Sequence, residues 1–238
     1  CNEDERGHLH GGFVGLDKKN WKTSELGNNY VIMSTGLSDG EEGYPGNISI
    51  SIKYAIIDDA FEITYNATSD ADTVFNPTNH SYFNPNGKGD ILDCVLKISS
   101  DYVTPVNEKM IPLGMLMPVK DTPFDFNKPK LIQKDIFQER EQLEICGGYD
   151  HNYVLNGTAV LYSQKTGIKI TCETTMPGLQ LYTGNFLSYK YKKYSGVCLE
   201  TQFYPNSLNV AEFPQPILRA GEFFTSKTKY AFEKYKSF

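Results

Sequence analysis

The sequence predicts an all-β fold, a large antiparallel β-sandwich with few short helices. Apolar and polar residues alternate with a period of two in many short segments, as they do in half-buried strands. The aromatic residues are mostly Tyr (16) and Phe (14), which favour strands over helices. Turn-forming pairs such as Asp39-Gly40 and Ala220-Gly221 separate these segments. Many short strands with turns between them are typical of a sandwich or barrel.

Two β-hairpins are the clearest predicted elements. In the first, residues 48–56 alternate Ile with Ser or Lys, and residues 60–67 follow after Asp58-Asp59. In the second, residues 159–163 and 168–174 flank a short segment that contains Gly. Both patterns predict antiparallel pairing of neighbouring strands.

The remaining elements are predicted from shorter patterns. Further strands are predicted at residues 94–98, 153–155, 179–183, 197–201 and 222–232. One helix is predicted over residues 131–143, because its apolar residues keep a roughly helical spacing. The sequence shows no internal repeat, low-complexity tract or linker, so we expect one domain over residues 1–238.

Composition excludes several classes of partner. The 238 residues carry a net charge of −6, and the lysines are scattered apart from one short run at residues 190–193. A nucleic-acid partner is therefore not expected. No apolar run is long enough to span a bilayer and no signal sequence is present, so no membrane partner is expected either.

The cysteines indicate a reducing compartment. There are five of them, they are widely spaced, and none forms a C-x-x-C pair. This usage predicts reduced thiols, mostly filling the core of a cytoplasmic protein. The sequence leaves open whether that protein is a monomer or a homodimer.

Three short segments carry most of the candidate chemistry: NHSYFN (79–84), GYDHN (148–152) and CLETQ (198–202). The chain has only four histidines, and His80 and His151 lie in two of these segments. Rare ionisable side chains thus coincide with strings of amides and aromatic rings. This pattern is typical of a site that transfers protons to a hydroxyl-rich ligand.

His80 and Glu200 are the candidate acid and base. An imidazole can give and take a proton near neutral pH, although a lone His is more often a core residue with local hydrogen bonds. In the strand pattern Glu200 shares a face with Cys198 and Gln202. If that face is buried, the pKa of Glu200 rises and the carboxylate becomes a usable base. If it is exposed, Glu200 is an ordinary surface residue.

Asp150 and His151 are adjacent, so on a strand they point to opposite faces and at most one of them lines a given pocket. Gln180 and Asn185 lie beside Tyr182, in PGLQLYTGN (177–185). Amides next to aromatic rings are typical of sugar pockets, but they also cap turns and fill cores.

His8 and His10 form an H-x-H pair. On a strand the two rings would share a face and could bind a metal ion. The sequence offers no third ligand, and Gly11-Gly12 indicates a turn instead. We therefore expect no metal site. Glycine-rich nucleotide motifs and the G-x-S-x-G motif are also missing from the sequence.

Taken together, seven segments resemble the aldose 1-epimerase (galactose mutarotase) family, in the family's order and over nearly the whole chain. They are HLHGG (8–12), DGEEGYPG (39–46), TNHSYFN (78–84), GYDHNYVL (148–155), PGLQLYTGNFL (177–187), CLETQFYPNSLN (198–209) and FPQPILRAGE (213–222). Each segment alone is a weak signal, whereas seven in order are specific.

The resemblance implies the galactose mutarotase-like supersandwich and interconversion of the α and β anomers of aldohexoses, without a cofactor. It implies Glu200 as general base and His80 as general acid. The residues expected to bind the sugar are His10, Asp150, Gln180, Asn79 and Tyr82.

The sequence departs from the family at its start. Family members have further strands before HLHGG, and those strands carry a substrate-binding arginine. Here the only arginines are Arg6, Arg140 and Arg219, and none lies in a matching context. We expect a domain that lacks the family's N-terminal strands. The alternative function is then a non-catalytic carbohydrate-binding sandwich, and a metal-dependent enzyme using the H-x-H pair is a third hypothesis.

Overall fold

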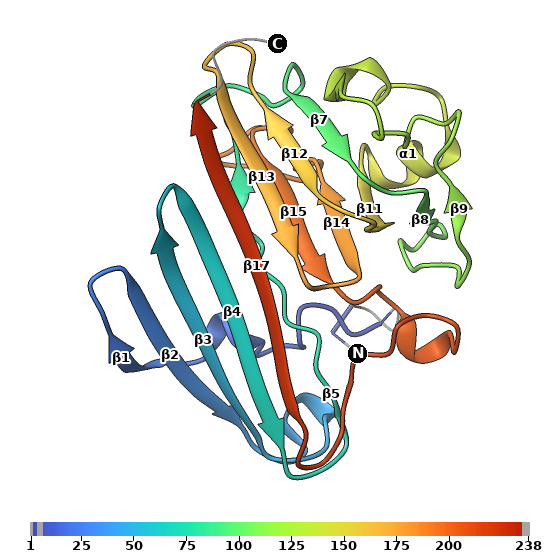
Figure 1. Ribbon diagram of the computed structural model, residues 1–238. Helices are drawn as coiled ribbons and strands as arrows, with labels where there is room; N and C mark the ends of the chain where they lie inside the picture. The colour runs from blue at the N-terminus through green and yellow to red at the C-terminus, as the bar shows by residue number, and fades with distance from the viewer. Residues whose placement is uncertain (1, 4–6, 235–238) are drawn as a thin grey trace. The chain divides into compact units, whose positions relative to one another are not determined.

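The chain of this computed structural model divides into two units (Figure 1), and the structure describes residues 2–3 and 7–234. Unit 1 holds the described residues up to Pro77 together with Gln215–Thr228. Unit 2 holds Thr78–Pro214 and the described residues from Lys229 onward. Arg6, named above, lies outside the described residues. Each unit is described by itself.

Unit 1 is built on an antiparallel sheet with strand order β1-β2-β3-β4-β17. A two-stranded ladder joins β5 to β16, and two 3₁₀ helices lie in the loops. The elements are η1 (Leu16–Lys18), β1 (Lys22–Leu26), β2 (Tyr30–Leu37), η2 (Glu41–Gly43), β3 (Ile48–Ile57), β4 (Ala60–Ser69), β5 (Thr73–Val74), β16 (Ile217–Leu218) and β17 (Phe223–Lys234), the last of which continues into unit 2.

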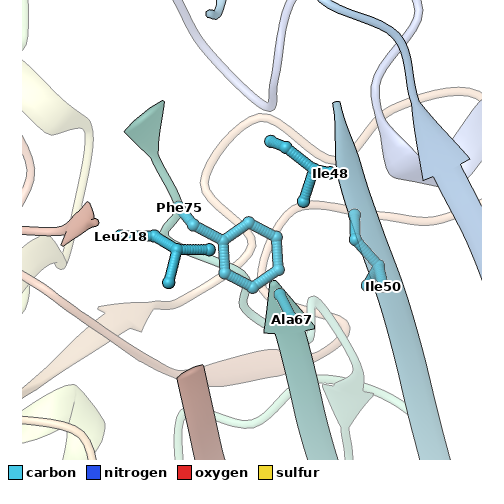
Figure 2. Packing of buried hydrophobic residues seen from close by; sticks show 5 residues of the cluster. All are labelled: Ile48, Ile50, Ala67, Phe75 and Leu218. Carbon is cyan, nitrogen blue, oxygen red and sulfur yellow. The ribbon is translucent and has the colours of Figure 1, made fainter. Parts of the chain in front are cut away.

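The first predicted hairpin is confirmed as β3 and β4. Ile57 pairs with Ala60, and Asp58 takes the left-handed conformation (φ 51°) that a tight turn requires. Alternate residues of β3 are buried, including Ile48 and Ile50. Figure 2 shows these two side chains and Ala67 gathered around the ring of Phe75, with Leu218 on the other side of the ring. Burial of this cluster holds the ladder against the hairpin.

Unit 2 contains a six-stranded sheet with order β6-β15-β14-β11-β8-β9 and a second set of strands with order β17-β13-β12-β7-β10. Its elements are β6 (Tyr82–Phe83), β7 (Val95–Ile98), β8 (Tyr102–Thr104), β9 (Met117–Pro118), β10 (Lys130–Leu131), η3 (Ile132–Lys134), α1 (Glu141–Cys146), β11 (Asp150–Val154), β12 (Ala159–Tyr162), β13 (Ile168–Thr174), β14 (Gly178–Tyr182), β15 (Val197–Gln202) and η4 (Ser207–Asn209).

The two sets of strands in unit 2 form two layers, with β12 and β13 in front of β14 and β15 in Figure 1. Tyr230 of β17 joins the layers: it is fully buried, and its hydroxyl donates to the Leu199 carbonyl of β15 at 2.7 Å. Its ring also packs against Phe83 of β6, with centroids 4.9 Å apart. The six-stranded sheet therefore has one face turned toward the core between the layers.

The second predicted hairpin is confirmed as β12 and β13, and the five further predicted strands are present as β7, β11, β14, β15 and β17. The strands that the patterns did not predict are short or partly exposed, such as β1, all of whose residues are exposed, and the two-residue strands β6 and β9. The all-β prediction is confirmed, because the one α-helix of the described residues has only six residues. The strands pair in antiparallel fashion, as β3 does with β4, β11 with β14 and β14 with β15.

The predicted helix at residues 131–143 is wrong. The segment begins in β10, continues as η3, and only Glu141–Cys146 is α-helical. The Ile132 and Gln133 amides donate to the carbonyls of Cys94 and Leu92 rather than to a helical turn. Ile132 and Ile136 are nevertheless buried. The apolar spacing that had indicated a helix therefore reflects side chains buried from irregular backbone.

Across residues 2–3 and 7–234, no helix has the length and hydropathy needed to cross a membrane.

Candidate active site

The polar side chains of the six-stranded sheet lie on one face of its middle strands. One row of paired residues runs Asn152, Gln180, Glu200 across β11, β14 and β15. The next row runs Asp150, Tyr182, Cys198, Tyr82 and ends on β6. Residues directly opposite each other in a sheet share a face. The alternate positions, such as Leu179, Leu181 and Leu199, are apolar and fully buried on the other face.

Glu200 lies in the middle of this polar face, on a strand whose six residues are all buried. Its exposed fraction is only 6%, so the interpretation as a surface residue is wrong. Burial and, to a smaller extent, the nearby negative charge of Asp150 together raise the pKa of Glu200 to about 8. The carboxyl group is thus poised to exchange a proton near neutral pH.

His80 faces Glu200 from the segment that precedes β6. Its Nε2 atom lies 3.6 Å from Glu200 Oε1, and its Nδ1 atom lies 3.3 Å from Cys198 Sγ. The ring stacks on Tyr82 with centroids 5.1 Å apart and meets the edge of Tyr182 at 6.1 Å. The side chain keeps 37% of its surface exposed, so His80 is not a core histidine. A ligand can reach the imidazole from solvent.

Asp150 and Gln180 continue the polar face beside Glu200. Gln180 Nε2 donates to Asp150 Oδ1 at 2.8 Å, and Gln202 Nε2 donates to Gln180 Oε1 at 3.3 Å. Burial raises the pKa of Asp150 to about 6, although the hydrogen bond from Gln180 acts in the opposite direction. Gln202 and Asn152 complete this network. They were not singled out as binding residues, yet period-two alternation with Glu200 and Asp150 would have found them.

His151 points to the opposite face from Asp150, as adjacent strand residues must. It is fully buried, and its ring meets Phe124 edge-on at 4.7 Å. The Asp150 amide donates to His151 Nδ1 at 3.1 Å, so Nε2 carries the proton and donates to Gln142 Oε1 at 3.3 Å. Burial lowers the pKa of His151 to about 3. The side chain is a neutral core residue.

We therefore predict that His151→Asn costs stability rather than catalysis. Loss of the ring's packing and of its hydrogen bond to Gln142 lowers the free energy of unfolding by about 1–3 kcal/mol. The kcat of the folded fraction stays within about threefold of the wild type, since a group on the far face contributes no proton transfer. Urea unfolding and kinetics on the same preparation check both parts. A loss of kcat without a loss of stability contradicts the assignment of faces.

Two other predicted residues have different surroundings. Asn79 Oδ1 accepts a hydrogen bond from the Ser81 amide at 3.2 Å. This bond stabilises the turn that contains His80. Asn185 is buried and donates to the carbonyls of Cys146 and Tyr149. Of the two interpretations of Asn185, the structure supports the one in which it fills the core.

His8 and His10 belong to unit 1 and do not lie on a strand, so the premise of a shared strand face is wrong. His8 Nδ1 hydrogen-bonds the Tyr44 hydroxyl. His10 has φ 55° and leads into a turn in which Gly12 has φ 100°. This φ value lies in a region that L side chains rarely adopt, so the turn favours glycine at this position. The role of His10 in binding sugar stays a prediction.

Among residues 2–3 and 7–234, one group of three side chains is spaced so that it could hold a metal ion. It consists of His80, Cys198 and Glu200, whose ligand atoms all lie within 4.8 Å of one another. The same imidazole and carboxylate can also move protons directly, which needs no metal.

Comparison with known proteins places the chain in a family. The model of the aldose 1-epimerase family matches residues 1–231. The chain belongs to the aldose 1-epimerase family. The chain is 38% identical to galactose mutarotase from Rattus norvegicus, and 36% identical to aldose 1-epimerase from Escherichia coli (strain K12). The alignments cover 96% and 94% of this chain, and 70% of each relative.

Solved structures support the same family. A GalM/aldose epimerase homologue from C. elegans superposes with a TM-score of 0.89 at 27% identity, over 96% of this chain and 73% of that one. Galactose 1-epimerase from Lactobacillus acidophilus NCFM superposes with a TM-score of 0.87 at 30% identity, over 96% and 70%. The resemblance inferred from seven sequence segments is confirmed, and so is the fold class that it implied.

Proposed function

We propose that the protein is an aldose 1-epimerase that interconverts the α and β anomers of an aldohexose such as galactose or glucose. The observation that carries this proposal is the 3.6 Å separation between Nε2 of the partly exposed His80 and Oε1 of the buried Glu200. Family membership supports the reaction class. The proposed site residues rest on the geometry described above.

The reaction needs one proton removed from the anomeric hydroxyl and one delivered to the ring oxygen. Glu200 takes the hydroxyl proton and His80 donates from Nε2 to the ring oxygen. The electron pair of the C1–O5 bond goes to that oxygen, and an open-chain aldehyde forms. Rotation about C1–C2 turns the other aldehyde face toward the ring oxygen, which then attacks C1 while both protons return.

The spacing of the two groups suits this chemistry. Both oxygens are bonded to C1, so acid and base must lie close together, each within about 2.6–3.2 Å of its oxygen. The 3.6 Å gap between Nε2 and Oε1 allows the two side chains to bracket such a pair of oxygens. The base is also sheltered from water, so its carboxylate is more weakly solvated and more basic than a surface Glu.

The surrounding groups suit a sugar. Asp150 and Gln180 present a carboxylate and an amide that can hydrogen-bond hydroxyl groups. Tyr82 offers a half-exposed ring to the apolar face of a pyranose. We assign sugar binding to these three residues, and to Asn79 on the resemblance to the family. The four cysteines of the described residues are free and buried, as expected for a cytoplasmic protein.

Polarimetry of freshly dissolved α-D-galactose tests the proposal. With the protein, the rotation should relax to the same final value faster than in buffer, and a chelator such as EDTA should not change the rate. Relaxation at the buffer rate, with protein that galactose protects against thermal unfolding, would instead indicate the non-catalytic carbohydrate-binding alternative. Loss of activity in EDTA would indicate a metal-dependent enzyme.

We predict that Asp150→Asn shifts the pH dependence of catalysis. The negative charge of Asp150 raises the pKa of Glu200, so its removal favours the ionised carboxylate and lowers that pKa. The rising limb of kcat/KM therefore moves to lower pH, while KM increases because a hydroxyl-binding group is weakened. Measuring kcat/KM from pH 5 to 9 checks this. Asp101→Asn, at an exposed site of unit 2, is the control, and a limb that stays in place or moves upward contradicts the coupling.

A further inference from the structure

We infer that His80, Cys198 and Glu200 form a binding site for a thiophilic divalent cation such as Zn²⁺, and that an ion bound there inhibits the protein. The binding site goes beyond the proposed function, since it gives the candidate acid and base a ligand other than a sugar. Only the inhibition rests on that function, in which Glu200 accepts a proton.

The three side chains converge on one part of the polar face. Cys198 and Glu200 are alternate residues of β15 and share that face, and His80 reaches them from the segment that precedes β6. One candidate ligand atom from each residue lies within 4.8 Å of the other two. A tetrahedral Zn²⁺ with bonds of about 2.0–2.3 Å holds its ligand atoms roughly 3.3–3.7 Å apart, so side-chain movements of about 1 Å close the group around an ion.

The donor set is one that zinc favours. It combines a thiolate sulfur, an imidazole nitrogen and a carboxylate oxygen, whereas Mg²⁺ and Ca²⁺ prefer oxygen ligands alone. The ion needs only one nitrogen of His80, which leaves the other for the further interaction of that residue. The His80 side chain keeps 37% of its surface exposed, so an ion can enter from solvent and keep water as a fourth ligand.

Charge favours an ion in this buried place. Cys198 is fully buried and Glu200 is 6% exposed, and burial raises the pKa of both side chains because an isolated negative charge is costly there. A divalent cation cancels the charges of a thiolate and a carboxylate together. Binding therefore displaces the thiol proton, and the carboxyl proton where one is present, into solvent. The negative charge of Asp150 acts on both groups and adds to the attraction.

A bound ion blocks the proposed reaction at its first step. A carboxylate coordinated to Zn²⁺ is a much weaker base than a free one. Saturating Zn²⁺ should therefore lower the rate by about 10²-fold or more, as removal of a general base does. Ion and sugar also compete for the same groups, so galactose should raise the Zn²⁺ concentration that gives half inhibition.

Co²⁺ is the probe for the site, because it takes the geometry of Zn²⁺ and gives a near-ultraviolet charge-transfer band when a thiolate binds it. The band is measured as Co²⁺ is added to metal-free protein. Cys1 lies outside the described residues, and Cys1→Ser is present in every sample so that this thiol cannot contribute. Cys198→Ser removes the proposed sulfur ligand. Cys172→Ala is the matched control, because Cys172 is a fully buried free thiol on β13.

We expect one equivalent of Co²⁺ to produce the band in the parent protein, and Zn²⁺ to remove it by displacing Co²⁺. The band should be absent from Cys198→Ser and unchanged in Cys172→Ala.

Polarimetry measures the inhibition. Zn²⁺ should inhibit the parent protein and Cys172→Ala alike, EDTA should restore the full rate, and the same concentration of Mg²⁺ should have no effect. Cys198→Ser, referred to its own metal-free rate, should need at least about tenfold more Zn²⁺ for the same fractional inhibition.

Two results would overturn the binding site: no thiolate band at saturating Co²⁺, or a band that survives Cys198→Ser. If Cys198→Ser does not fold, Glu200→Gln and His80→Asn decide. Each keeps the thiol but removes another ligand, so each should lower the affinity for Co²⁺ by about tenfold or more. Unchanged affinity in both variants would equally contradict the site.

The inhibition and the proposed function fail in different ways. An active protein that shows the band but keeps its full rate in saturating Zn²⁺ would overturn the inhibition. If the proposed function is wrong, the metal-free protein relaxes galactose at the buffer rate, while the Co²⁺ titration, which needs no catalysis, still shows the band.

Discussion

Glu200→Gln will lower kcat by about 10²–10⁴-fold, the range typical of a positioned general base. Gln has nearly the same shape and keeps a hydrogen-bonding oxygen, but it cannot accept the anomeric proton. Polarimetry at pH 8.5 measures the loss under conditions where the wild-type carboxyl is largely ionised. A variant that keeps most of the wild-type kcat contradicts the assignment of Glu200 as the base.

The same variant should be more stable than the wild type at alkaline pH. The pKa of Glu200 is about 8 in the folded protein and near 4.5 in the unfolded chain, so the folded state binds more protons between these values. Wild-type stability therefore falls as pH rises from about 4.5 to about 8, and Gln, which does not titrate, escapes this loss. The difference should reach on the order of a few kcal/mol and level off above pH 8.

Thermal or urea unfolding from pH 5 to pH 9 measures this stability difference. The control is Glu173→Gln, the same substitution on β13 at a side chain that is 54% exposed, which should change stability little at any pH. If the stability gained by Glu200→Gln does not grow with pH, then burial does not destabilise the ionised carboxylate. Joint loss of kcat and gain in stability is typical of an active site whose charged group is costly to bury.

The sequence predicted correctly which residues of β15 share one face of the sheet. Glu200 was expected to share a face with Cys198 and Gln202, and the register of β15 places all three on the polar face, because a strand alternates strictly. The same rule predicted that Asp150 and His151 lie on opposite faces, and the structure shows Asp150 beside Gln180 and His151 against Phe124. Period two is a local property, so it can be read without knowing the tertiary structure.

The wrong helix prediction and the unpredicted strand β6 both concern segments whose structure depends on long-range pairing. Residues 131–143 have helical spacing, but their first amides bond to carbonyls some 40 residues earlier, which no local pattern records. The two-residue strand β6 is too short to show alternation and exists because Tyr82 and Phe83 pair with β15. The contact between the Cys198 thiol and His80 spans 118 residues and depends on that same pairing.

His80→Ala will also lower kcat by about 10²–10⁴-fold, because the ring oxygen then leaves C1 without a proton donor. The substitution should cost little stability, since 37% of the side chain is exposed and the neighbouring tyrosines pack on each other with centroids 6.2 Å apart. His80→Asn should show a similar loss of kcat. Activity near the wild-type level in either variant contradicts the acid assignment.

Added imidazole separates a chemical role for His80 from a structural one. Removal of a half-exposed ring beside Tyr82 and Tyr182 leaves space between aromatic groups that a free imidazole can enter from solvent. We expect imidazole to restore part of the kcat of His80→Ala in a concentration-dependent, saturable way. It should not rescue Glu200→Gln, whose missing group is a buried carboxylate, and that variant is the control. Equal rescue of both variants would show that imidazole catalyses ring opening in solution and that the site at His80 is not involved.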